Sequence, residues 1–545
     1  MSLDASQLLP SDPLESFKGP ELFIGLVGPI GTNRDEIYTA LNDSLHSYGY
    51  ETKRVRLSST LHEVDGLEWL PEIHGDEFTR IERHMRAGTK VREITGRADA
   101  LAYFAVAEIR RLRAQSNEAE PNGLDWQSEP ELLENTVQRS TAYVLDSLKH
   151  PKEIETLRAI YGRAFITISI HTTRSRRVTS LTDHLKTTKP NADHDGQLEQ
   201  QATMLVQIDE KEEGTELGQK VRSAFPKADF FLNEKDTATI RKDVKRFLEL
   251  LFNHPFRTPT IDEYGMFFAE ASSWRSADLS RQVGAAILSD KGEIISVGFN
   301  EVPKAFGGYN WEGDQPDHRD FQNGKDPGTK HKNQMVAEII HRMADSDLIT
   351  SDNKKQEARE IASKITQGKE TDLLKDIKAA NVIEFGRSVH AEMAAICDAA
   401  SRGVSIKGAQ LFVNTFPCHI CARHILASGI SRVVYIEPYP KSLTTDLYRN
   451  QITEDSSEAC SKVPFEAFRG VSPRQYQFFF KLQSERKDSA GQAVNWSEKT
   501  AEPRMQRYVL SYIALEQAAT GEIIERLISK LSHEKDQLEA LKPKH

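Results

Sequence analysis

The chain has 545 residues, of which 38% are hydrophobic and 28% are charged, and its formal net charge is −10. A single core rarely grows past ~250–300 residues, so this length predicts two to four domains, and the net acidity argues against a dedicated binder of long nucleic acid. With four cysteines and no run of about 18 apolar residues, the sequence excludes a disulfide scaffold and a membrane span, and we expect a cytoplasmic protein.

The first half of the chain predicts an α/β domain. Residues 1–20 contain three prolines and lack a basic region before an apolar run, so we expect a disordered leader rather than a signal peptide. Over residues 21–254, helical patterns alternate with the apolar runs "LFIGLVG", "TAYVLD", "AFITISI" and "ADFFLN". This alternation predicts βαβ units around a parallel sheet.

A glycine-rich loop follows the first apolar run. The segment "GLVGPIGTNRDEI" has the strand, loop and helix context of a phosphate-binding loop. The full motif is G-x-x-x-x-G-K-[ST], and counted from Gly28 its last three positions hold Asn33, Arg34 and Asp35. We therefore expect Gly28, Gly31, Asn33 and Arg34 to bind a nucleotide without robust kinase chemistry. The alternative is a glycine turn that only packs a helix on the sheet.

Two further segments of this half remain open to two interpretations. Asp146 ends the apolar run "AYVLD" and fits either a Mg²⁺-binding acid of the Walker B type or a helix cap. The basic segment 174–178, "RSRRV", fits either a phosphate-contacting lid or a solvated turn. The expected ligand of this domain is a nucleotide, with or without Mg²⁺.

A second α/β/α domain is predicted over residues 262–482. It begins with a helix and the strands "QVGAAIL" and "EIISVGFN", which a turn joins into a hairpin. A polar insertion over about 303–380 follows, and then helix, strand, helix and strand patterns in "HAEMAAICDAASRG", "AQLFVNT", "PCHICARHILASG" and "RVVYIEPY". Residues 483–545 predict a helical extension.

The segment "PCHICAR" holds Cys418 and Cys421, and this spacing suits a redox pair, half of a structural zinc site or part of a catalytic one. His390 and Glu392 lie upstream in "VHAE", and H-x-E followed by P-C-x-x-C is the signature of zinc nucleobase deaminases. Three protein ligands leave the fourth zinc position for water, and Glu392 can transfer protons. The order of the motifs therefore favours one catalytic Zn²⁺.

Residues two apart on a helix do not face the same side, so His390 and Glu392 converge only at the first turn of their helix. Pro417 suits the start of a second helix, which would carry Cys418 and Cys421 in its first turn. The isolated Cys397 and Cys460 are expected to be small buried side chains.

These motifs, together with "RQVGAAIL" and "GEIISVGFNEVP", resemble the CMP/dCMP deaminase family of the cytidine deaminase-like fold. In that family the asparagine that ends the second hairpin strand contacts the sugar, and the resemblance assigns this role to Asn300. The resemblance covers about 265–445.

The whole layout, a P-loop kinase-like domain joined to a deaminase domain, resembles the bacterial antiphage deaminases that deplete deoxycytidine nucleotides. The resemblance implies conversion of dCTP and dCMP to dUTP and dUMP in antiphage defence, regulated by the N-terminal domain. It also implies a homo-oligomer and, for some members, an inhibitory small RNA. The alternatives are a deaminase that edits DNA or RNA and a sensing module with a structural zinc.

Overall fold

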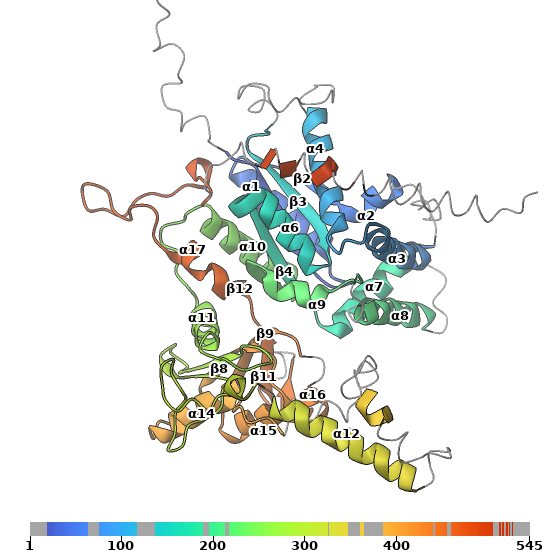
Figure 1. Cartoon of the computed structure of the whole chain (residues 1–545). Helices are drawn as coiled ribbons and strands as arrows, with labels where there is room; N and C mark the ends of the chain where they lie inside the picture. Colours follow the sequence, from blue (N-terminus) through green and yellow to red (C-terminus); the bar gives the residue numbers. More distant parts are fainter. Residues whose placement is uncertain are drawn as a thin grey trace, which may run out of the picture. The chain divides into compact units, whose positions relative to one another are not determined.

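The computed structural model describes residues 19–63, 76–116, 137–188, 196–212, 217–324, 326–346, 360–364, 385–439, 442–454, 459–504 and part of 512–526. The chain divides into two compact units, which Figure 1 shows in cartoon form. Unit 1 comprises residues 1–259 and 468–545, and unit 2 comprises residues 260–467. Most of the expected leader lies outside the described residues.

Unit 1 is built on a six-stranded sheet. Its strands are β1 (Leu22–Val27), β2 (Glu51–Arg56), β3 (Thr141–Leu148), β4 (Phe165–His171), β5 (Phe230–Asn233) and β12 (Gly470–Val471). The order across the sheet is β12-β5-β4-β1-β3-β2, and β1 to β5 are mutually parallel. The chain builds outward from β1 first to one side and then to the other, so the loop after β1 lies at the topological switch point where α/β sheets bind ligands.

Helices cover both faces of this sheet (Figure 1). They are α1 (Arg34–Ser47), α2 (Leu57–Thr60), α3 (Glu77–Thr95), α4 (Ala100–Ser116), α6 (Pro151–Tyr161), α9 (Val221–Ala224), α10 (Thr237–Leu251) and α17 (Tyr476–Phe480). Two further helices, α7 (Arg174–Thr188) and α8 (Gln197–Glu212), pack against each other and against Met85 of α3 in a smaller cluster. All six residues of β1 are buried; Leu22, Ile24 and Leu26 pack in the core with α1 and α10, whereas Phe23 and Val27 pack with α4 and α6. The parallel sheet and its glycine loop give unit 1 the P-loop kinase-like fold expected from the sequence.

The segment after residue 467 returns to unit 1. Strand β12 pairs antiparallel with the edge strand β5, and the ring of Phe468 lies edge-on to Phe231 with centroids 5.6 Å apart. The sequence predicts that the second domain ends at residue 482, whereas unit 2 ends at Ala467. Pairing with β5 covers an open edge of the parallel sheet, which explains the earlier boundary.

Unit 2 is also an α/β fold. Its sheet has the order β10-β11-β9-β8-β6-β7, formed by β6 (Gly284–Leu288), β7 (Ile294–Phe299), β8 (Gln410–Thr415), β9 (Arg432–Glu437), β10 (Ile452–Thr453) and β11 (Val463–Ala467). The strands β6 and β7 form the expected antiparallel hairpin, and β8 and β9 are parallel. The sheet packs with α11 (Ile261–Ser273), α14 (Ala391–Ser401) and α15 (His419–Ala427).

The described part of the insertion contains α12 (Pro327–Asp345), and the short α16 (Thr444–Leu447) follows β9. Residues 347–359 and 365–384 of the insertion lie outside the described residues, as do 505–511 and 527–545 of the predicted C-terminal helical extension. None of the helices that the structure describes combines the length and apolarity that a bilayer crossing requires.

Candidate metal centre and its pocket

His390 and Glu392 lie at the start of α14, as the spacing argument predicts. His390 is the N-cap residue, with φ −68° and ψ 153°, so its backbone is extended rather than helical. Glu392 lies in the first turn and is 4% exposed. The change from extended to helical backbone between the two residues allows an imidazole and a carboxyl only two positions apart to face the same region.

Cys418 and Cys421 lie at the start of α15, which follows β8. Cys418 is the N-cap, and its sulfur accepts a hydrogen bond from the Cys421 amide at 3.5 Å. Both cysteines are buried. The two sulfurs therefore sit at a helix N-terminus, where the dipole favours negative charge and so the thiolate form.

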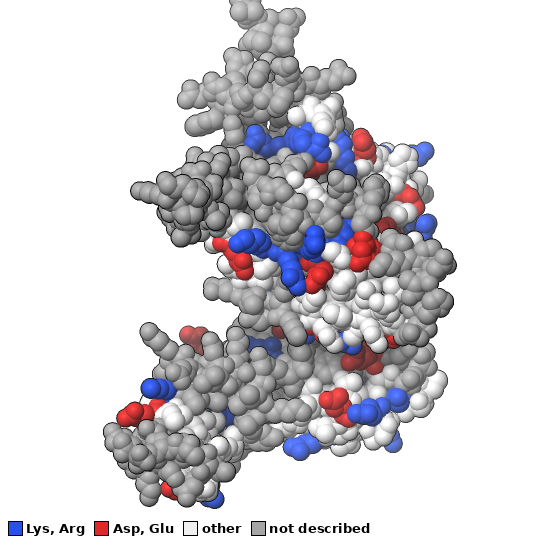
Figure 2. Space-filling model, turned by 90° about the vertical axis from the view of Figure 1, so that its right-hand side faces the viewer, with Lys and Arg blue, Asp and Glu red and all other residues white. Residues whose placement is uncertain are grey.

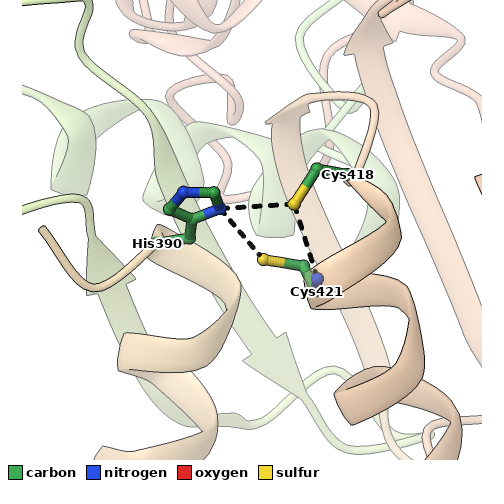
Figure 3. A group of neighbouring side chains, drawn as sticks. All are labelled: His390, Cys418 and Cys421. Atoms are coloured by element: carbon green, nitrogen blue, oxygen red, sulfur yellow. Dashed lines mark hydrogen bonds between the residues drawn. The ribbon is translucent and has the colours of Figure 1, made fainter. Parts of the chain in front are cut away.

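The two helix starts bring the imidazole and the sulfurs together (Figure 3). His390 Nδ1 lies 3.4 Å from each of the two sulfurs, Sγ of Cys418 and Sγ of Cys421. All three atoms lie within 4.8 Å of one another. Ligands at 2.0–2.3 Å from a tetrahedral Zn²⁺ are themselves about 3.5–3.8 Å apart, so this donor set fits zinc in both type and spacing.

A glycine on β7 allows α14 to approach the sheet this closely. A Cβ at Gly298 would lie 2.3 Å from the Ala391 carbonyl oxygen and 2.4 Å from the Ala395 nitrogen. Real side chains do not approach backbone atoms to these distances, so only glycine permits the contact. Gly298 thereby positions the first turn of α14, which holds His390 and Glu392.

The charges of these groups depend on one another. Hydrogen bonds from Cys421 and His390 lower the pKa of Cys418 to about 4, so this sulfur is a thiolate at neutral pH. The same contact with Cys418 raises the pKa of His390 to about 9. Burial raises the pKa of Glu392, whose Oε2 lies 3.3 Å from the Cys421 sulfur.

His390, Glu392 and Cys418 line a cavity of about 460 Å³, a size that accommodates a nucleotide. Asn300 also lines it and is 6% exposed. Its Oδ1 accepts a hydrogen bond from the Val283 amide at 2.7 Å and its Nδ2 donates to the Arg281 carbonyl at 2.8 Å. An asparagine amide has one more donor hydrogen and one more lone pair, so Asn300 retains capacity to bind a ligand.

Several lining residues had no signal in the sequence. Arg281, Lys332 and Arg387 bring positive charge to the cavity, and Arg387 pairs with Asp320 of the insertion at 2.8 Å. Lys332 lies on α12, so the insertion does reach the cavity. Lysines and arginines in a polar insertion carry no local pattern that distinguishes a pocket wall from a solvated loop.

The expectation for the two remaining cysteines is wrong, because Cys397 and Cys460 are both exposed. Cys397 lies on α14, on the side that faces away from the buried alanines of that helix. The burial preference of cysteine is an average, and the periodicity of a single helix decides each case.

In unit 1, Gly31 has φ +83°, and a Cβ there would lie 2.6 Å from the Arg177 carbonyl oxygen. Two of the loop amides are already bonded within the chain. Ile30 donates to Asp209 Oδ2 at 3.1 Å, and Asn33 donates to Glu234 Oε2 at 3.2 Å. These carboxylates take positions at which a phosphate-binding loop would offer its amides to a ligand.

Asp146 lies beside this loop and is held between two arginines. Its Oδ1 is 2.8 Å from Arg34 Nε, and its Oδ2 accepts from Arg54 Nε at 3.1 Å. Gly28 lies on the same loop, and its carbonyl accepts a hydrogen bond from Lys149 Nζ at 2.9 Å. The structure thus brings the predicted N-terminal residues together, with Arg34 and Asp146 paired to each other.

The basic segment 174–178 is the first part of α7 rather than a turn. Arg177 is 7% exposed; its Nη2 lies 3.0 Å from Asp209, and its Nε donates to the Ile30 carbonyl at 2.9 Å. Arg177 therefore holds both the glycine loop and Asp209 in place. The sequence predicted either a phosphate-contacting lid or a solvated turn for this segment, and neither includes such a role.

Comparison with known proteins agrees with this geometry. Residues 259–437, about a third of the chain, match the family model described as the cytidine and deoxycytidylate deaminase zinc-binding region. The matched range contains His390, Cys418 and Cys421. This part of unit 2 is therefore similar to the zinc-binding region of that family.

The deoxycytidylate deaminase of enterobacteria phage T2 is 45% identical over 64 residues, which is 11% of this chain and 34% of the phage protein. The chain spans about a third of the length of the first curated relatives that it matches. A dCMP deaminase from cyanophage S-TIM5, solved with dCMP and dUMP, is 18% identical with TM-score 0.22, over 39% of this chain and 100% of that one. A shikimate kinase from Acinetobacter baumannii is 15% identical with TM-score 0.22, over 45% of this chain and 100% of that one.

Proposed function

We propose that the chain is a zinc-dependent hydrolytic deaminase of free deoxycytidine nucleotides, which converts dCMP, dCTP or both to the deoxyuridine nucleotide and ammonia. The observation that carries the proposal is the convergence of His390, Cys418 and Cys421 beside a buried Glu392. Three of these residues, His390, Glu392 and Cys418, line one cavity. Zinc bound by three protein ligands acts as a Lewis acid that activates water near neutral pH.

Glu392 is proposed as the group that moves protons. The reaction forms a C4–O bond, breaks the bond from C4 to the exocyclic nitrogen, and releases ammonia. The Glu392 carboxyl accepts one proton from the attacking water and delivers it to the ring nitrogen. It then accepts the second proton of that water from the new C4 hydroxyl and donates it to the leaving amine, which departs as ammonia. Its raised pKa suits this work, because a carboxyl that titrates closer to neutral pH exchanges protons in both directions.

The positive side chains of the cavity are proposed to hold the substrate phosphate, and Asn300 the sugar. Arg281 and Lys332 line the cavity together with the metal group. An ionic hydrogen bond contributes about 1.5–3 kcal/mol, so Arg281→Ala or Lys332→Ala should raise KM for dCMP about tenfold to a hundredfold. KM for deoxycytidine, which lacks the phosphate, should change little.

One assay tests the reaction. Purified, zinc-loaded protein is incubated with dCMP, dCTP, CTP and single-stranded cytosine-containing DNA, and the uracil product and ammonia are measured. We expect product from the free deoxynucleotides, and Glu392→Gln should lower kcat by about 10²–10⁴ while about one zinc per chain remains. Product from the polymer alone would establish an editing deaminase, and no product from any substrate would leave a structural zinc.

The proposed biological role is depletion of deoxycytidine nucleotides during phage infection, under control of unit 1. It rests on the resemblance of the two-domain layout to antiphage deaminases. An oligomer and an inhibitory small RNA belong to the same proposal. Expression in a phage-sensitive host, with Glu392→Gln as the control, should lower dCTP and dCMP after infection only for the wild type; equal pools in both strains would contradict the role.

A further inference from the structure

Unit 1 contains a cavity of about 380 Å³ that the deaminase reaction does not use, and we call it the basic pocket. It lies between the loop after β1, the end of β2, the helix α3 and the helix α7, and all of its lining residues belong to unit 1. Six of these residues are cationic and two are acidic; the cations are Arg34, Arg54, Arg56, Arg80, Arg92 and Lys149, and the acids are Asp35 and Asp146. Three carboxylates behind the wall also pair with these cations, Glu77 with Arg80, Glu153 with Arg92 and Asp209 with Lys149. The groups that line the pocket are therefore mostly positive, although the net charge of the whole cluster is small.

One of the cations is buried and incompletely bonded. Arg92 is 1% exposed, and its Nη2 lies 2.7 Å from Glu153. Its Nε and Nη1 atoms are buried and have no hydrogen-bond partner among the described residues. A buried N–H group without a partner costs roughly 1–3 kcal/mol, and native structures hold few of them. Two such groups on a guanidinium that lines a cavity indicate a ligand that accepts hydrogen bonds.

The glycine loop does not supply this function itself. The amides of Ile30 and Asn33 are bonded to Asp209 and Glu234. The carboxylates repel an anion that approaches the loop from their side. An anion in unit 1 is therefore expected in the basic pocket beside the loop, rather than on the loop amides.

The remaining wall of the basic pocket is apolar. It is formed by Ile30, Leu57, Leu61, Ile81, Met85, Leu101 and Leu181. A small inorganic anion would leave this surface in contact with water, whereas an anion joined to a flat, mostly apolar body would cover it. On the face that Figure 2 shows, Lys and Arg side chains among the described residues of unit 1 lie beside Asp and Glu.

We propose that the basic pocket binds a nucleoside phosphate, with its phosphate on Arg92 and the neighbouring cations and its base against the apolar wall. The basic pocket is lined in part by residues that the sequence predicts to bind a nucleotide, namely Gly31, Asn33, Arg34 and Asp146. The proposal differs from that prediction because it places the phosphate on Arg92 rather than on the loop amides, and it does not depend on the deaminase activity. Arg92 belongs to α3 and Arg54 to β2, so a bound phosphate would connect these two elements.

Gly88 offers a way to close the pocket without removing a charge. It lies on α3 and lines the pocket, and a Cβ there would lie 3.6 Å from Leu101 Cδ1 and 4.0 Å from Arg92 Nη1. These are ordinary contacts, so Gly88→Ala should fold with the pocket open. Gly88→Leu adds the bulk that fills the space in front of Arg92.

The test is calorimetric titration of the full-length, zinc-loaded chain with the four deoxynucleoside 5′-monophosphates and, separately, with inorganic phosphate. We expect at least one nucleotide to bind the wild type and Gly88→Ala alike, and Gly88→Leu to weaken that binding at least about tenfold, which corresponds to 1.4 kcal/mol. Inorganic phosphate should bind more weakly than the nucleotide because it does not reach the apolar wall.

Arg92→Met should have the same effect as Gly88→Leu, with Arg86→Met as its control. Arg86 lies on the same helix, but its side chain is 67% exposed and pairs with Glu82. Arg92→Met leaves the buried Glu153 without its cation, so this variant can fail to fold. In that case the comparison of Gly88→Leu with Gly88→Ala decides whether the nucleotide binds in the pocket. Equal nucleotide affinity in Gly88→Leu and Gly88→Ala, no binding to the wild type, or binding of inorganic phosphate alone would overturn the proposal.

Discussion

In both units a helix begins directly after a buried strand of the sheet, but different groups lie at the two helix N-termini. In unit 2, α15 follows β8 and presents Cys418 and Cys421 to His390 within a cavity. In unit 1, α1 follows β1, and two amides of the loop between them are bonded to Asp209 and Glu234. The same arrangement of strand, loop and helix start therefore holds the candidate metal centre in unit 2 and makes an internal structural contact in unit 1.

A segment of strand, loop and helix therefore does not by itself define a ligand site. A helix N-terminus offers donors and a positive field to any acceptor. In unit 2 the neighbouring helix α14 brings the imidazole of His390, which binds a metal ion in its neutral form, and the carboxyl of Glu392. The site can therefore bind a cation. In unit 1 the neighbouring elements bring carboxylates, which satisfy the donors within the chain.

The largest expected effect comes from removing a metal ligand. Cys421→Ser should abolish deaminase activity and lower the bound zinc well below one ion per chain, because a hydroxyl replaces a thiolate in a three-ligand site. Metal analysis after dialysis measures it. Cys397→Ser, an exposed cysteine on α14, is the matched control and should keep both zinc and activity. Full zinc occupancy in Cys421→Ser would remove Cys421 from the ligand set.

The next effect tests how β7 positions the metal site. Gly298→Ala should destabilise unit 2 by about 1–3 kcal/mol or more and weaken zinc binding, because its Cβ would overlap the backbone of α14. Urea denaturation and competition with a chelator measure the two effects. Gly88→Ala, whose Cβ makes only ordinary contacts, is the control. Unchanged zinc affinity in a folded Gly298→Ala protein would separate the first turn of α14 from metal binding.

The next effect is on stability alone and is expected at the ion pairs beside the glycine loop. Asp146→Asn keeps the shape of the side chain but leaves Arg34 and Arg54 without their shared carboxylate. We expect a loss of about 3 kcal/mol, the low end of the range for a broken buried pair, since the arginines are partly exposed. Asp43→Asn removes an exposed carboxylate 3.5 Å from Arg241 and should change the unfolding free energy by less than about 1 kcal/mol. Equal effects of the two variants would contradict a structural role of Asp146.

The smallest effect depends on pH and concerns His171, at the end of β4. Burial disfavours the charged imidazole and lowers its pKa to about 4, against about 6.5 in the unfolded chain. The unfolded state therefore takes up the proton first, so stability is full above about pH 6.5 and falls as the pH is lowered toward 4. Between pH 7 and pH 5 the loss from this group should be about 2 kcal/mol. In His171→Gln the pH dependence should shrink by that amount; an unchanged slope would mean that other groups cause it.

The grouping of His390, Cys418 and Cys421 could be predicted from the sequence because each part of it is local. His390 with Glu392, and Cys418 with Cys421, are short motifs at helix starts, and the extended backbone of the two N-cap residues follows from their spacing. The alternating strands and helices of both units were predicted for the same reason, since buried strands and amphipathic helices show their periodicity within a few residues.

Tertiary structure decided the rest, because the deciding contacts join residues far apart in the chain. Asp209 is 179 positions from the amide of Ile30, and Glu234 is 201 positions from Asn33. No local pattern encodes which carboxylate meets which amide. The pairing of β12 with β5 and the free N–H groups of Arg92 also arise only when the sheet and its helices are assembled. Short motifs in the sequence are thus enough to predict that His390, Cys418 and Cys421 come together. Packing between distant segments, by contrast, determines that the amides of Ile30 and Asn33 bond to carboxylates of the chain and that the basic pocket lies beside the glycine loop.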